Sequence, residues 1–141
     1  MKFIVLGLVC LAFVKIGHAQ ETYLLIRKGG GVTGISDVYK IDLDGKVQKG
    51  KGLGEIRYTE ESKLRKCRTK KYFRKVKTLL ASYPNFNHPG NLYSSIAFYD
   101  QSTERTITWG DPQKDVPDDA TDLYQRISTA LSKLKFTPQI P

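Results

Sequence analysis

The stretch Tyr23-Leu24-Leu25-Ile26-Arg27-Lys28-Gly29-Gly30-Gly31-Val32-Thr33-Gly34 decides how this chain folds. Its last six residues spell G-x-G-x-x-G after a strand-like run, which is how a dinucleotide-binding loop begins. That loop requires a helix that starts at the last glycine and points its N–H groups at the phosphates. The residues after Gly34 instead alternate in polarity as far as the turn signal Asp44-Gly45. The sequence therefore predicts a β-hairpin with a glycine tip at residues 29–34, and no bound nucleotide.

The N-terminus has the pattern of a secretory signal peptide. Lys2 provides the positive start, residues 3–14 form an apolar run too short to span a bilayer, and Gly17 and Ala19 are the small residues of a cleavage site. We therefore predict a signal peptide at residues 1–19, a secreted or periplasmic protein, and no transmembrane anchor after cleavage. Removing 19 of 141 residues leaves 122, with the net charge lowered from +9 to +7. That length predicts one domain, residues 20–141.

The order of the predicted elements indicates an α+β fold. The hairpin at residues 23–43 continues into a third strand at 46–49, and a helix is expected from the N-cap Thr59 to residue 83. A second hairpin follows at 93–99 and 105–109, then a helix that begins at Pro117 and an irregular tail from about residue 136. We predict an antiparallel sheet in the order β-meander, helix, β-hairpin, helix, with the helices packed on one face.

Residues typical of catalysis or metal binding are sparse after the signal peptide. His88 and Cys67 are the only histidine and cysteine there, too few N and S ligands for a dedicated zinc site. Cys67 is interpreted as a buried small hydrophobe, with an oxidisable thiol as the alternative. An aspartate-rich stretch could hold calcium, but helix capping explains the same residues; it comprises Asp111, Asp115, Asp118, Asp119 and Asp122. The sequence therefore predicts a non-enzymatic protein with no cofactor and no metal.

Positive charge is concentrated at residues 63–77, which contain nine Lys and Arg residues and no acid. Tyr72 and Phe73 lie among them, so the segment also has the composition of a nucleic-acid-binding face. Two interpretations stay open: a solvated helix face, or a surface that binds polyanionic surface polymers. The candidate polyanion-binding residues are Lys63, Lys66, Lys70, Lys71, Arg74 and Lys77.

Two segments resemble a known family. The opening Ile26-Arg27-Lys28-Gly29-Gly30-Gly31-Val32-Thr33-Gly34 is similar to the start of emfourin-like proteins. Tyr93-Ser94-Ser95-Ile96-Ala97-Phe98-Tyr99-Asp100, with Thr106-Ile107-Thr108-Trp109-Gly110-Asp111 and Val116-Pro117, is similar to that family's closing hairpin and last helix. In the order of elements the resemblance covers nearly the whole chain after the signal peptide.

Emfourins inhibit protealysin-like, thermolysin-type zinc metalloproteases, so the resemblance implies that this protein binds a protease and performs no chemistry of its own. A secreted zinc metalloprotease is then the expected partner. An inhibitor of this kind needs a protruding segment held on a rigid scaffold. The glycine tip and the loop at residues 111–116 are the two candidate protrusions. The predicted contact residues are Arg27, Gly29, Gly30, Gly31, Val32, Thr33, Gly34, Asp111 and Asp115.

Overall fold

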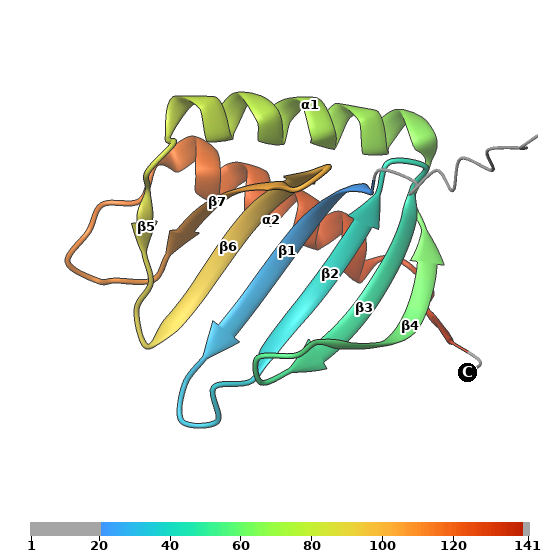
Figure 1. Cartoon of the computed structure of the whole chain (residues 1–141), viewed down its shortest axis with the longest axis horizontal. Coiled ribbons are helices and arrows are strands. Elements are labelled where there is room, and N and C mark those ends of the chain that lie inside the picture. The colour runs from blue at the N-terminus through green and yellow to red at the C-terminus, as the bar shows by residue number, and fades with distance from the viewer. Residues whose placement is uncertain (1–20, 140–141) are drawn as a thin grey trace, which may run out of the picture.

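The computed structural model describes residues 21–139, which form one eight-stranded sheet and two helices (Figure 1). The strand order is β5-β7-β6-β1-β2-β3-β4-β8, and every described pair is antiparallel except β5 with β7. The elements are β1 (Thr22–Gly30), β2 (Ser36–Asp42), β3 (Lys46–Gly52), β4 (Arg57–Lys63), α1 (Lys66–Ser82), β5 (Asn87–His88), β6 (Leu92–Asp100), β7 (Thr103–Trp109), α2 (Asp118–Ser132) and β8 (Thr137–Pro138). The predicted α+β class is confirmed.

The first hairpin forms as the sequence predicts. β1 and β2 pair from Tyr23 opposite Asp42 to Lys28 opposite Asp37, and the glycine tip joins them. Leu24 and Ile26 point to one side of β1 and are almost fully buried, as the two-residue period of a strand requires. Because β2 follows the tip, the helix of a dinucleotide-binding loop is not formed at this position.

The predicted start of the first helix is wrong. Thr59, Glu60 and Glu61 lie in β4, and α1 begins only at Lys66. Glu60 lies directly opposite Lys49 on β3 and forms an ion pair with it at 3.2 Å, and Glu61 forms another with Lys46 at 3.2 Å. These cross-strand pairs favour the strand over the helical tendency of the glutamates. Sheet pairing thus overrides a capping pattern that would be convincing in isolation.

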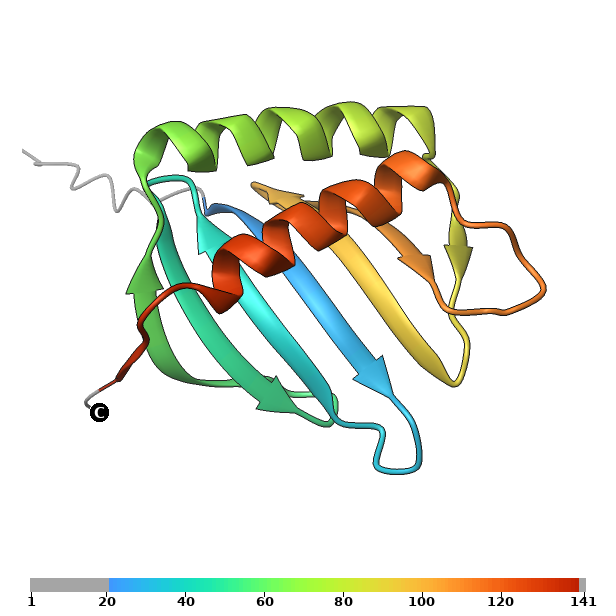
Figure 2. The same ribbon diagram turned by 180° about the vertical axis from the view of Figure 1, so that it is seen from behind.

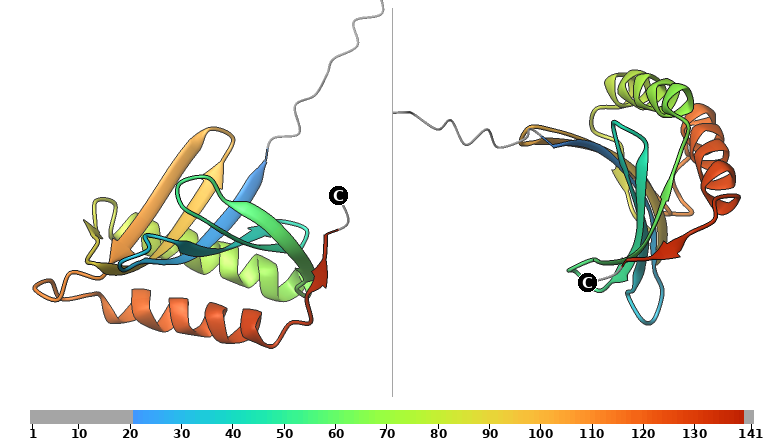
Figure 3. Two further views of the ribbon diagram at one scale, coloured as in Figure 1. Left: turned by 90° about the horizontal axis from the view of Figure 1, so that it is seen from below. Right: turned by 90° about the vertical axis from the view of Figure 1, so that its right-hand side faces the viewer.

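Both helices cover one face of the sheet (Figures 2 and 3). The buried side of α1 consists of Thr69, Tyr72, Phe73, Val76, Leu79 and Leu80, and that of α2 of Ala120, Leu123, Ile127, Ala130 and Leu131. These side chains form one core with inward residues of the sheet such as Phe98, Ile96 and Ile107, all fully buried. Figure 2 shows α2 crossing the strands, so the opposite face of the sheet is free of helices.

The second hairpin, β6 and β7, and the helix after Pro117 are also confirmed, but the tail is more ordered than predicted. Phe136 packs against Tyr39 with ring centroids 5.9 Å apart. Thr137 then pairs with Glu61, and the Gln139 N–H donates to the Thr59 carbonyl at 2.8 Å. Pro138 is tolerated because β8 lies at the edge of the sheet, where its missing N–H costs little.

Tyrosine side chains gather at the helix-free face. The rings of Tyr23 and Tyr99 stack with centroids 4.8 Å apart, and the Lys40 ammonium lies 4.3 Å from the Tyr23 ring centroid. Burial, followed by the nearby Tyr99 and Glu21, raises the pKa of Tyr23 to about 12. Its phenol therefore stays protonated in the folded protein at a pH where an unfolded chain would ionise it.

This shift predicts a stability change at high pH. The folded state retains the Tyr23 proton between about pH 10 and 12, whereas the unfolded state releases it. The Tyr23 contribution is complete below pH 10, and we expect it to be lost as the pH rises to 12. Chemical denaturation at several pH values measures the loss, and Tyr23→Phe should show a shallower decline. An identical decline in both proteins would contradict the assignment.

Two sequence predictions concern residues outside, or only partly inside, the described part of the chain. The signal peptide lies at residues 1–19, outside the described residues. Between residues 21 and 139, neither helix is long and apolar enough to cross a membrane.

Candidate functional site

Four turns lie along one end of the sheet (Figure 1). β1, β3 and β7 end there, and β2, β4 and β6 begin there. The turns are residues 31–35, 53–56, 89–91 and 110–117, and we call this end of the molecule the turn edge. Both protrusions predicted from sequence, the glycine tip and the aspartate loop, belong to it.

Backbone contacts join the two predicted protrusions into one surface. The Gly31 N–H donates to the Asn91 carbonyl at 2.7 Å. A Cβ atom on Gly110 would lie 2.1 Å from the Leu92 carbonyl oxygen, so the start of the aspartate loop lies against the same segment. The glycine tip and the aspartate loop are therefore neighbours across residues 91–92, and a partner could contact both at once.

Apolar side chains are exposed along the turn edge. Val32 is fully exposed at the tip, and Ile35, Leu53 and Leu92 are exposed by 46%, 72% and 63%. These are four of the five exposed large hydrophobic residues in the described chain, and the fifth, Leu43, lies at the other end of the sheet. Single exposed leucines are ordinary, but a contiguous apolar patch marks an interaction surface.

Two of these side chains flank the tip itself. A Cβ atom on Gly31 would lie 3.4 Å from Leu92 Cδ2, and one on Gly34 would lie 2.9 Å from Leu53 Cδ1. Ile35, Leu53 and Leu92 were missed in the sequence because each is an isolated apolar residue in a turn-like context. Only the strand register places them together, and periodicity along the chain carries no such information.

The glycine tip has a defined conformation. Gly30, Gly31 and Gly34 have positive φ angles of 98°, 76° and 63°, which side chains other than glycine rarely adopt. The Gly34 N–H donates to the Gly31 carbonyl at 3.1 Å and closes the turn. The glycines therefore shape a turn that presents Val32 and Thr33, rather than a loop without fixed structure.

The two aspartates of the predicted site differ in their surroundings. The Asp111 side chain accepts the Gln113 N–H at 2.9 Å, and the Asp111 carbonyl accepts the Lys114 N–H at 3.2 Å. Its carboxylate is therefore engaged in its own turn, as is common for aspartate. Asp115 is exposed further along the loop. Of the two carboxylates, Asp115 is the one better placed to reach a partner.

Arg27 lies on the helix-free face, two residues before Gly29. Its Nε atom is buried and has no hydrogen-bond partner among residues 21–139. Burial raises the pKa of the Tyr58 hydroxyl, and the nearby Arg27 guanidinium partly offsets this rise. Next to Gly29, the Ser36 and Tyr93 hydroxyls are 2.8 Å apart and share a hydrogen bond. A buried donor without an acceptor is unfavourable, so a partner that supplied an acceptor to Arg27 would relieve that cost.

The structure also corrects the interpretation of Cys67, which is exposed on the first turn of α1 and not buried. The thiol is therefore accessible.

His88 lies in β5, beyond the other end of α1 (Figure 1), with its ring against Phe86 at 4.8 Å between centroids. In the described part of the chain, no three His, Cys, Asp or Glu side chains gather closely enough to hold a metal ion.

Comparison with protein-family models finds no matching family, and comparison with curated proteins finds no match. The resemblance to emfourin-like proteins thus rests on the sequence segments quoted above and stays a prediction.

Proposed function

We propose that this protein is a secreted, non-enzymatic inhibitor of thermolysin-type zinc metalloproteases that binds its target through the turn edge. The observation that carries the proposal is the gathering of four exposed apolar side chains around the glycine tip. The emfourin-like sequence supplies the class of partner. One of the two segments that resemble this family, residues 26–34, contains the tip.

The turn edge has the properties that an inhibitor of this kind needs. The tip protrudes between two long strands and presents Val32 in a turn fixed by positive φ angles. A segment already held in its bound shape loses little conformational entropy on binding. The paired strands β1 and β2 would also keep both sides of a cleaved bond in place, which favours inhibition over release of products.

Inhibition assays test the proposal directly. The purified protein is incubated at micromolar concentration with thermolysin and related proteases, and the residual peptidase activity is measured. We expect saturable inhibition. Added zinc should not reverse this inhibition, because zinc restores activity only where the metal has been removed by chelation. Undiminished activity of several such proteases would overturn the proposed function.

Val32→Asp is expected to weaken inhibition about 10-fold to 100-fold, which corresponds to roughly 1.4–2.7 kcal/mol. Val32 is fully exposed, so the change removes an apolar contact from the interface and leaves the fold intact. The matched control is Leu43→Asp, because Leu43 is 49% exposed and lies in the β2–β3 turn at the opposite end of the sheet. The inhibition constants of both variants measure the loss of binding, and thermal melting checks that both remain folded. Equal losses in the two would argue against the turn edge.

A further inference from the structure

All nine basic side chains at residues 63–77 are exposed. The five ion pairs described in the structure join other residues to their partners, and none includes a member of this group. The sequence contains no acid from Ser62 through Tyr99. None of the five described ion pairs therefore neutralises the charge of these nine side chains, and counter-ions or a partner can compensate it.

The surroundings divide the six candidate residues into two sets. Lys63 lines a shallow groove with Glu61 and Asp44, and Arg74 lines another with Asp119 and Asp122. The Lys77 ammonium lies over the Phe98 ring, 4.9 Å from its centroid. Lys66, Lys70 and Lys71 line none of these grooves. With Arg65 and Arg68 they place five cations within the seven residues 65–71, which we call the basic segment.

The position of the basic segment on the helix is unfavourable for helix stability. The first turn of α1 has no acidic residue and its Arg65 N-cap makes no side-chain hydrogen bond, whereas α2 begins with Asp118 and Asp119. Because the N-terminus of a helix carries partial positive charge, acids stabilise it and cations oppose it. α2 follows this preference and α1 reverses it. A bound anion would relieve both the dipole and the mutual repulsion of the cations.

The exposed side of α1 also indicates which kind of anion fits. Tyr72 and Phe73 give the segment the composition of a nucleic-acid-binding face, but both are buried under the helix, with 9% and 5% exposure, and cannot stack on bases. α1 has no exposed large hydrophobic side chain to enter a membrane, since the five in the described chain are Val32, Ile35, Leu43, Leu53 and Leu92. The exposed side of α1 can therefore recognise an anion only through its density of positive charge.

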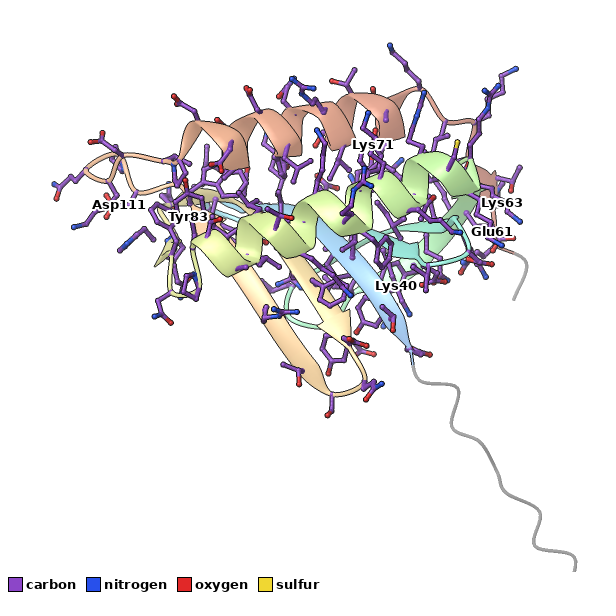
Figure 4. All side chains as sticks on the ribbon, turned by 90° about the horizontal axis from the view of Figure 1, so that it is seen from above. Lys40, Glu61, Lys63, Lys71, Tyr83 and Asp111 are labelled. Atoms are coloured by element: carbon purple, nitrogen blue, oxygen red, sulfur yellow. The ribbon has the colours of Figure 1, made fainter. Side chains whose placement is uncertain are left out.

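We propose that the basic segment of α1 binds an acidic polysaccharide that carries sulfate, phosphate or carboxylate groups. Lys66, Lys70 and Lys71 provide the main contacts, with Arg65 and Arg68 beside them. Figure 4 shows Lys71 on the half of α1 where the helix begins, Lys63 of β4 beside that end of the helix, and Tyr83 and Asp111 at the far end. The surface is therefore separate from the turn edge, and the inference does not depend on the proposed protease inhibition.

The test compares two triple variants of the purified protein with the same net charge. Lys66, Lys70 and Lys71 are each replaced by Glu in one, and the exposed Lys28, Arg57 and Lys114 in the other. Heparin is the probe, and affinity is measured at several salt concentrations. We expect the first variant to lose about tenfold or more in affinity and roughly two units of salt slope, as for the loss of about three ionic contacts. The second should lose much less.

Several results would overturn this proposal. Two concern heparin itself: an equal loss of heparin affinity in the two variants, or no binding of heparin by the wild type. Two concern other anions: tighter binding of duplex DNA than of heparin at equal salt, or binding of phosphatidylserine vesicles without heparin binding. Thermal melting separates these outcomes from misfolding, because Glu in the first turns of α1 should preserve or raise helix stability. Protease inhibition by the first variant should be unchanged, so each proposal can fail without the other.

Discussion

Phe98→Ala is expected to lower the free energy of unfolding by about 3–5 kcal/mol. Phe98 is fully buried on β6 and meets the Phe73 ring of α1 edge to face, with centroids 6.1 Å apart. The Lys77 ammonium and the Arg105 guanidinium lie over the Phe98 ring at 4.9 and 5.5 Å. Truncation leaves a cavity between the sheet and α1. The protein then loses both the hydrophobic free energy of burying the Phe98 ring and the packing contacts of that ring with α1.

Urea denaturation measures this loss, with circular dichroism as the readout. Val32→Ala is the control, because Val32 is fully exposed and a surface change of this kind stays within about 0.5 kcal/mol. A loss below about 1 kcal/mol for Phe98→Ala would mean that the core collapses around the vacancy, or that α1 does not pack on β6 as described. A domain of this size has about 5–15 kcal/mol of total stability, so the variant should remain folded at low temperature.

The sequence was sufficient where a segment decides its own structure. Alternation after Gly34 identified β2 and excluded the dinucleotide loop, and Pro117 with Asp118 and Asp119 marked the start of α2. It was insufficient where distant pairing decides. Glu60 and Glu61 look like the first turn of a helix but pair with lysines on β3. No local pattern distinguishes these two uses of glutamate.

The candidate site shows the same division. The glycines at residues 29–34 could be assigned to a hairpin tip because strands flank them on both sides. That the aspartate loop lies beside this tip could not be inferred, since the contact runs through Asn91 and Leu92 and depends on β6 pairing with β1. Cys67 is exposed because it lies off the buried stripe of α1, which includes Tyr72, Phe73 and Val76, and the apolar Leu64 three residues before it precedes the helix.

Gly30→Ala is expected to destabilise the protein by about 2–4 kcal/mol and to weaken protease inhibition with it. Two costs combine at this position. The φ angle of 98° is unfavourable for alanine, and the new Cβ would stand 2.0 Å from the Asn91 carbonyl oxygen, a backbone atom that cannot rotate away. Since Gly30 pairs with Leu92, β1 and β6 must separate at the place where the tip meets the rest of the turn edge.

Gly54→Ala separates the two costs. Gly54 also has a positive φ, 82°, but its Cβ would have nothing within 4 Å. It should therefore lose only the conformational part, about 1 kcal/mol. The difference between the two variants measures the close approach of the tip to residues 91–92. If Gly30→Ala and Gly54→Ala melt alike, the tip is not held against β6. A turn edge that depends on that contact would then lose its rigid scaffold, and with it the physical basis for binding through a preformed surface.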